Sequence, residues 1–221
     1  MKTFLGIGEC MVELSDAGPG LWRQGFAGDV FNTLWYARAM LPADGPEHWQ
    51  VRFFTAVGRD PISDQLIAFA EDAGITCADV PRIAGRVPGL YAIHLNEGER
   101  SFSYWRDTSA ARLMMQDRSH LETVVAQADL IYFSGITLAI LPPEDAAGLI
   151  RLLGDARRAG KLVAFDPNIR PRLWDSPDRM RATLLAGAGV ADILLPGFDD
   201  EAMAFGDADP EATARRYAAL G

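Results

Sequence analysis

Short apolar runs alternate with segments of helical character along most of the chain. The apolar runs predict β-strands over residues 3–8, 51–57, 129–133, 161–165 and 192–195. Helical spacing and helix-start signals predict helices over residues 33–40, 61–74, 143–159 and 210–220, and a further helix that starts at Ser176-Pro177. Strands that alternate with helices are typical of a mainly parallel sheet covered on both faces, so we expect an α/β fold.

One segment, residues 90–106, breaks this alternation because two β-rich runs flank a polar turn at 96–99, which predicts a hairpin. A loop of two or four residues pairs Tyr91 with Tyr104 and turns Arg106 to the same face; a three-residue loop would break this register. An aromatic face that ends in an arginine suits a lid over a polar ligand or a contact between subunits. The alternative is a hairpin packed on its own domain.

A polar cluster follows the predicted strand 161–165, in the sequence Asp166-Pro167-Asn168-Ile169-Arg170. Ligands bind at the carboxyl ends of strands in open α/β sheets. The guanidinium groups of Arg170 and Arg172 suit phosphate or carboxylate, so this segment is a candidate anion site. The alternative is a turn in which Asp166 caps backbone amides and the arginines are solvated.

Glycine and polar residues also precede the predicted helix 33–40, where the chain reads Gly28-Asp29-Val30-Phe31-Asn32. A helix N-terminus presents free N–H donors, and the side chains of Asp29 and Asn32 can bind hydroxyl groups. The alternative is that Asp29 serves as an ordinary helix cap.

The composition and charge of the chain indicate which kind of molecule it binds. The chain has 221 residues, 49% of them hydrophobic, and a net charge of -9, which fits one globular domain that binds a small molecule rather than nucleic acid or a membrane surface. Cys10 and Cys77 are the only cysteines and sit in apolar contexts, so we expect a reduced, cytoplasmic protein. Neither G-x-G-x-x-G nor G-x-x-x-x-G-K-[ST] occurs, so neither of these phosphate-binding loops is present.

Five stretches together resemble the ribokinase-like (PfkB) sugar kinases, and within them the 2-keto-3-deoxygluconate kinases. They are Ile7-Gly8-Glu9-Cys10-Met11-Val12-Glu13, Phe26-Ala27-Gly28-Asp29-Val30-Phe31-Asn32-Thr33, Arg100-Ser101-Phe102-Ser103-Tyr104-Trp105-Arg106, Ser134-Gly135-Ile136-Thr137-Leu138 and Asp166-Pro167-Asn168-Ile169-Arg170. They follow the family order through nearly the whole chain. The Tyr-Trp-Arg run together with Asp-Pro-Asn-x-Arg is the most specific part of the likeness.

The resemblance implies a ribokinase-like three-layer α/β sandwich with a mainly parallel sheet and a small β lid, formed by about 12–25 and 87–107. It also implies ATP and Mg²⁺ as cofactors, a small-molecule sugar acid as substrate, and a homodimer formed through the lid, where Ile93, Leu95 and Phe102 offer apolar surface. The substrate-binding residues it implies are Gly28, Asp29, Asn32, Tyr91, Tyr104, Trp105, Arg106 and Arg170. The residues implied beside the nucleotide phosphate are Asn168, Ile169 and Arg170.

The chain departs from the family pattern at two places. Where many members carry Asn-x-x-Glu near the metal, this chain has Gly197-Phe198-Asp199-Asp200, so Asp200 or its neighbour Glu201 is the candidate for a magnesium-bound water. The family's Gly-Ala-Gly-Asp motif, which supplies the catalytic base, has no counterpart up to Gly221. We therefore expect the base beyond Gly221, no catalytic residue within the chain, and a 221-residue protein that is inactive and poorly stable.

The sequence thus predicts a kinase that transfers the γ-phosphate of ATP to 2-keto-3-deoxygluconate, giving the 6-phosphate. One alternative is a kinase for another sugar such as fructose or for a nucleoside, although Arg106 favours an acid. An alternative of another class is a non-catalytic module for sugar-acid binding or assembly.

Overall fold

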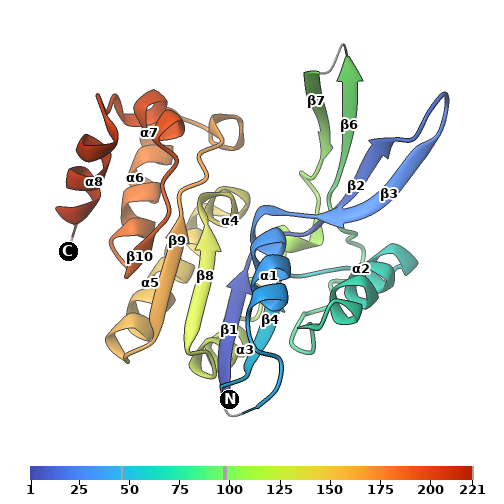
Figure 1. Cartoon of the computed structure of the whole chain (residues 1–221), viewed down its shortest axis with the longest axis horizontal. Coiled ribbons are helices and arrows are strands. Elements are labelled where there is room, and N and C mark those ends of the chain that lie inside the picture. Colours follow the sequence, from blue (N-terminus) through green and yellow to red (C-terminus); the bar gives the residue numbers. More distant parts are fainter. Residues whose placement is uncertain (46, 97–98, 221) are drawn as a thin grey trace. The chain divides into compact units, whose positions relative to one another are not determined.

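The computed structural model describes residues 1–45, 47–96 and 99–220 (Figure 1). The chain divides into two compact units. The first, Gly8–Gln116, is called the N-terminal unit. The second combines residues 2–7 with 117–220 and is called the C-terminal unit.

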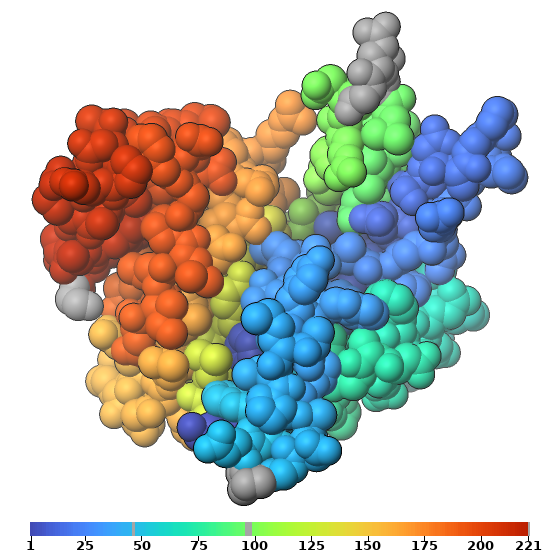
Figure 2. Space-filling view, viewed as in Figure 1, coloured from blue at the N-terminus to red at the C-terminus, as the bar shows by residue number. Residues whose placement is uncertain are grey.

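The N-terminal unit contains a small sheet and two larger helices. Its elements are β2 (Met11–Asp16), β3 (Trp22–Ala27), α1 (Asp29–Met40), β4 (Trp49–Phe54), α2 (Pro61–Asp72), β5 (Ile75–Thr76), β6 (Leu90–Asn96), β7 (Glu99–Trp105) and the 3₁₀ turn η1 (Ala110–Leu113). The small sheet has the strand order β3-β2-β6-β7, and β4 pairs with β5 in parallel. The β2–β3 hairpin projects into solvent from this unit (Figure 2).

Pairing in the small sheet confirms the hairpin register predicted from the sequence. Tyr91 lies opposite Tyr104 and Ile93 opposite Phe102 in the antiparallel β6–β7 pair. The predicted turn falls on residues 97 and 98, which lie outside the described part of the chain. Strand β2 pairs in parallel with β6 on its other side, so the hairpin belongs to a larger sheet rather than standing alone.

The C-terminal unit is built on a parallel sheet in the strand order β10-β9-β8-β1. Its elements are β1 (Lys2–Ile7), α3 (Arg118–Ala126), β8 (Leu130–Ser134), α4 (Gly135–Ile140), α5 (Pro143–Arg158), β9 (Leu162–Asp166), the 3₁₀ turn η2 (Pro171–Leu173), α6 (Pro177–Ala188), β10 (Ile193–Leu194), α7 (Phe198–Phe205) and α8 (Pro210–Ala218). The apolar runs that predicted strands are buried here, as Val163 and Phe165 of β9 illustrate at 0% exposure.

Helix boundaries follow the predicted capping chemistry. The side chains of Asp60, Ser176 and Asp209 each accept hydrogen bonds from backbone N–H groups in the first turn of α2, α6 and α8. Proline is the first residue of each of these helices, where it lacks only an N–H that would have no helical partner. Among the described residues, no helix is long and apolar enough to span a membrane.

Candidate functional site

One face of the small sheet gathers aromatic and acidic side chains, and we call the set Glu13, Tyr91, Phe102 and Tyr104 the tyrosine face. The ring centroids of Tyr91 and Tyr104 lie 5.8 Å apart, and Phe102 stacks on Tyr104 at 6.1 Å. The hydroxyl of Tyr91 donates a hydrogen bond to Glu13 Oε2. Burial, and then the hydrogen bond to Glu13, raise the pKa of Tyr91, so this hydroxyl stays protonated and remains a donor.

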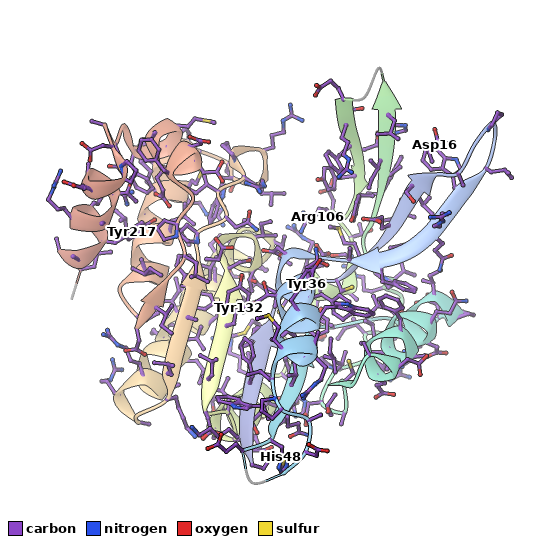
Figure 3. The ribbon with its side chains drawn as sticks, in the orientation of Figure 1. Asp16, Tyr36, His48, Arg106, Tyr132 and Tyr217 are labelled. Atoms are coloured by element: carbon purple, nitrogen blue, oxygen red, sulfur yellow. The ribbon has the colours of Figure 1, made fainter. Side chains whose placement is uncertain are left out.

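A buried acid–arginine pair lies at the base of the tyrosine face. Arg106 follows β7 directly (Figure 3). Its Nη2 donates a hydrogen bond to Glu9 Oε2. The hydroxyl of Ser109 donates to the other carboxylate oxygen of Glu9 at 2.6 Å. A Cβ atom built on Gly89 would lie 3.2 Å from the Cβ of Arg106 and 2.9 Å from Glu9 Oε1, which places both side chains on the same side of the sheet as Tyr91.

The start of α1 lies against the backbone of Glu9. A Cβ atom on Gly28 would lie 2.1 Å from the backbone oxygen of Glu9, so only glycine fits this close approach. Gly28 is the N-cap residue and Asp29 the first helical residue, which means that the interpretation of Asp29 as the cap is wrong. The negative charge of Asp29 contributes to a raised pKa for Glu9, so the two carboxyl groups interact. Asn32 is exposed one turn into the helix.

Trp105 lies on the opposite face of the small sheet. It lines a groove of about 410 Å³, which we call the apolar groove. The groove residues are Leu14, Trp22, Leu90, Ala92, His94 and Trp105. A larger cavity of about 530 Å³ has a lining that includes Ile62 of α2 and the consecutive residues Tyr104, Trp105 and Arg106. Of the predicted substrate-binding residues on the hairpin, Tyr91 and Tyr104 are in ring contact, whereas Trp105 lines the apolar groove without them and shares only the larger cavity with Tyr104 and Arg106.

In the C-terminal unit the segment after β9 forms a tight turn. The side chain of Asp166 accepts a hydrogen bond from the backbone N–H of Asn168 at 2.9 Å, as the turn interpretation predicted. Asn168 has a φ of 34°, in the left-handed region that few residues other than glycine adopt. A Cβ atom on Gly135 would lie 2.0 Å from the backbone oxygen of Pro167, so the start of α4 and the turn after β9 are in close contact.

Arg170 and Asp200, predicted for phosphate and metal, form an ion pair at 3.1 Å with side chains 52% and 37% exposed. Both groups are therefore within reach of solvent and of one another. The buried side chain of Ile169 leaves only its backbone for a ligand, and its carbonyl accepts a hydrogen bond from Arg170 Nη1.

Glu201, the other candidate for the metal, has a different role. Its side chain is 0% exposed, and its two oxygens accept hydrogen bonds from Arg216 at 2.7 Å and Tyr217 at 2.9 Å. Burial raises the pKa of Glu201, and the bonds from Arg216 and Tyr217 oppose that shift. The carboxylate of Glu201 thus links α7 to α8, and of the two candidate acids Asp200 is the one exposed to solvent. The described residues contain no cluster of three or more metal-binding side chains.

Sequence reasoning missed Glu9, Glu13 and Ser109 as site residues. Glu13 lies on β2, but Glu9 lies before that strand begins, so strand alternation does not link the two. Their spacing was therefore no usable signal. Ser109 follows the hairpin in an irregular segment, and no periodicity marks it.

Comparison with known proteins places this geometry in a family. Residues 6–220 match the pfkB family carbohydrate kinase profile. The chain is 37% identical over 223 residues to a 2-dehydro-3-deoxygluconokinase of Dickeya dadantii, and 36% identical over 224 residues to the enzyme of that name from Haemophilus influenzae. Each alignment covers 100% of this chain, and 71% and 70% of the relatives respectively.

A crystal structure of a PfkB protein from Polaromonas sp. JS666 superposes with a TM-score of 0.84 at 28% sequence identity. That alignment covers 100% of this chain and 73% of the Polaromonas chain. The α/β, ribokinase-like fold expected from the sequence is therefore confirmed.

Proposed function

The chain belongs to the pfkB family of carbohydrate kinases, and from this premise we propose that its substrate is the sugar acid 2-keto-3-deoxygluconate, with ATP as phosphoryl donor and the 6-phosphate as product. The observation that carries the proposal is Arg106, a cation at the base of a face of hydroxyl-bearing aromatic rings. The names of the Dickeya and Haemophilus relatives, which denote kinases of this sugar acid, support it independently.

Recognition of the acid falls to the N-terminal unit. Arg106 supplies a charge-assisted hydrogen bond to the substrate carboxylate, which is stronger than a bond between neutral groups. Tyr91 and Tyr104 present hydroxyls to the keto group and the sugar hydroxyls. Gly28, Asp29 and Asn32 bind hydroxyls at the start of α1, where backbone N–H groups and a carboxylate are available together.

The phosphate-binding part of the proposal rests on residues of the C-terminal unit. Asn168, Ile169 and Arg170 contact the transferred phosphate, with Arg170 countering its negative charge. Mg²⁺ uses one or two carboxylates together with phosphate oxygens and waters, so Asp200 fits it without a cluster of further acids. The metal would neutralise phosphate charge, and Arg170 would exchange its ion pair with Asp200 for the phosphate.

Kinases for fructose or a nucleoside are the alternatives of the same class, and binding distinguishes them. We expect isothermal titration calorimetry of the 221-residue chain to give a dissociation constant for 2-keto-3-deoxygluconate about ten-fold or more below those for fructose and adenosine, since only the acid pairs with Arg106. Tighter binding of fructose or adenosine would contradict the proposed substrate.

The apolar groove supports a further part of the proposal, a homodimer formed through the small sheet. Among the described residues that line the groove, His94 is the only acidic or basic side chain, whereas the whole chain carries a net charge of -9. Two copies therefore repel one another least where this uncharged surface meets its own symmetry mate. Phe102, which the sequence also offers for this contact, lies on the tyrosine face and is 45% exposed there.

Sedimentation at tens of micromolar tests the dimer. We expect a dimer for the natural chain and a monomer for Trp22→Glu, because the new carboxylate would be buried without a partner. A monomeric natural chain would contradict the proposal.

A further inference from the structure

Glu9 is buried, which is rare for an acidic residue. Its residue exposure is 2%, and the arginine it meets, Arg106, is 9% exposed. Charged side chains are almost never buried to this extent unless they are paired. This pair joins residues 97 positions apart in the sequence, so folding of the unit brings them together.

Two glycines next to Glu9 leave space for its side chain and its backbone. Gly89 leaves room for the carboxylate, since a Cβ atom there would stand 2.9 Å from Oε1. Gly28 leaves room for the main chain of Glu9 on another side. Ser109 donates to Oε1 while Arg106 donates to Oε2, so each oxygen has its own partner and the carboxylate plane is fixed.

Among the described residues, the guanidinium of Arg106 is hydrogen-bonded through one nitrogen, Nη2. Within residues 1–45, 47–96 and 99–220, its hydrogen-bond partner is Glu9, through Nη2. Its Nε is buried and has no partner among these residues. A guanidinium carries five donors, so the pairing with Glu9 leaves donors for a second anion.

We propose that Glu9 is a positioning residue: it holds the guanidinium of Arg106 from inside the unit, so that the remaining donors meet the carboxylate of the substrate in a fixed orientation. The inference rests on the proposed function, since it needs Arg106 to bind the acid group. It adds a residue that does not touch the substrate but sets how strongly the acid is preferred over a neutral sugar.

The competing explanation is that the Glu9–Arg106 ion pair serves stability alone. The charged groups around Glu9 bear on the choice between this explanation and the positioning role. Burial raises the pKa of Glu9, while Arg106 and Ser109 oppose this shift and the carboxyl group of Asp29 adds to it. Cys10 is the other titratable neighbour, and its own raised pKa keeps it neutral. Within the described part of the chain, Arg106 is the cation that interacts with Glu9, so it is the partner whose position Glu9 sets.

The experiment compares two ligands that differ only at the acid group. 2-Keto-3-deoxygluconate carries the carboxylate, and 3-deoxyfructose carries a hydroxymethyl group at the same carbon. The ratio of their dissociation constants, measured by calorimetry on the 221-residue chain, is the acid preference. A loss of stability alone leaves this ratio unchanged, because it affects both ligands equally.

Two changes at Glu9 separate position from charge. Glu9→Asp keeps the charge but withdraws the carboxylate by one methylene, so we expect the acid preference to fall about ten-fold with 3-deoxyfructose binding within about two-fold of the natural chain. Glu9→Gln keeps an oxygen for Arg106 and an amide for Ser109, so we expect the acid preference to stay within about three-fold or to rise.

Ser109→Ala, which frees one carboxylate oxygen, is the milder second variant and should lower the preference about two- to five-fold.

Asp79→Glu is the matched control. It shifts the carboxylate of another ion pair in the same unit, that with Arg52, and should lower the thermal midpoint without changing the acid preference. An acid preference within two-fold of the natural chain in both Glu9→Asp and Ser109→Ala would overturn the inference and leave the proposed function standing. A natural chain with no acid preference would overturn both.

Discussion

At the residue scale, strand alternation decides which side chains share a function. Tyr104 and Trp105 are neighbours in the sequence, yet Tyr104 belongs to the tyrosine face and Trp105 lines the apolar groove. The motif that marks the subfamily therefore serves two surfaces. Treating adjacent motif residues as one binding site overlooks this separation.

The separation gives a direct prediction. Tyr104→Phe removes one hydroxyl from a ring that is 53% exposed, so we expect binding of 2-keto-3-deoxygluconate to weaken by about 0.5–1.5 kcal/mol, the value of one hydrogen bond. Trp105→Phe on the other face should change the affinity by less than about 0.3 kcal/mol. Calorimetry that finds the larger loss in Trp105→Phe would show that the tryptophan binds the substrate.

Asn168 shows a second residue-scale constraint, in the backbone. Its φ of 34° strains any side chain with a Cβ atom, although asparagine tolerates it better than most. We expect Asn168→Ala to be less stable than Asn168→Gly by about 1 kcal/mol in urea unfolding. The opposite order would mean that the turn relaxes when the side chain is shortened.

At the scale of elements, helix ends were the most predictable feature. The Asp60-Pro61, Ser176-Pro177 and Asp209-Pro210 pairs each start a helix, because a capping oxygen and a proline act locally. Helices α3, α4 and α7 were not predicted. Helix α4 is only six residues long and begins directly at the end of β8, so it is too short for helical spacing of apolar residues to mark it.

The cap of α2 makes stability depend on pH. Burial opposes ionisation of Asp60, but hydrogen bonds from Ser63 and Ile62 outweigh it and lower the pKa below its usual 3.8. The ionised cap therefore stabilises the fold fully above pH 3.8, and this contribution is lost as the pH falls through the lowered pKa. Asp60→Asn keeps a capping oxygen without the charge, so the natural chain should be more stable by about 0.5–1 kcal/mol at pH 6.

Urea unfolding from pH 6 down to about pH 3 measures this difference, and we expect it to approach zero at the acid end. A difference that stays constant with pH would show that the charge of Asp60 contributes nothing.

At the scale of the whole molecule, local signals predicted the elements while distant contacts had to come from the structure. The α/β class followed from alternating strands and helices, and the hairpin register followed from loop length. The pairing of Glu9 with Arg106 could not be predicted, because no periodicity links positions 97 residues apart. The same holds for Glu201, which was a candidate for the metal as the neighbour of Asp200 and whose side chain accepts hydrogen bonds from Arg216 and Tyr217.

The central claim is that this member of the pfkB carbohydrate kinases recognises a sugar acid through Arg106. The most direct measurement is a crystal structure of the chain grown with 2-keto-3-deoxygluconate. We predict a carboxylate oxygen of the ligand about 2.7–2.9 Å from a nitrogen of Arg106, with Glu9 still bound to Nη2 and the sugar against Tyr91 and Tyr104. A ligand whose carboxylate lies elsewhere, with Arg106 bound to Glu9 alone, would contradict the account.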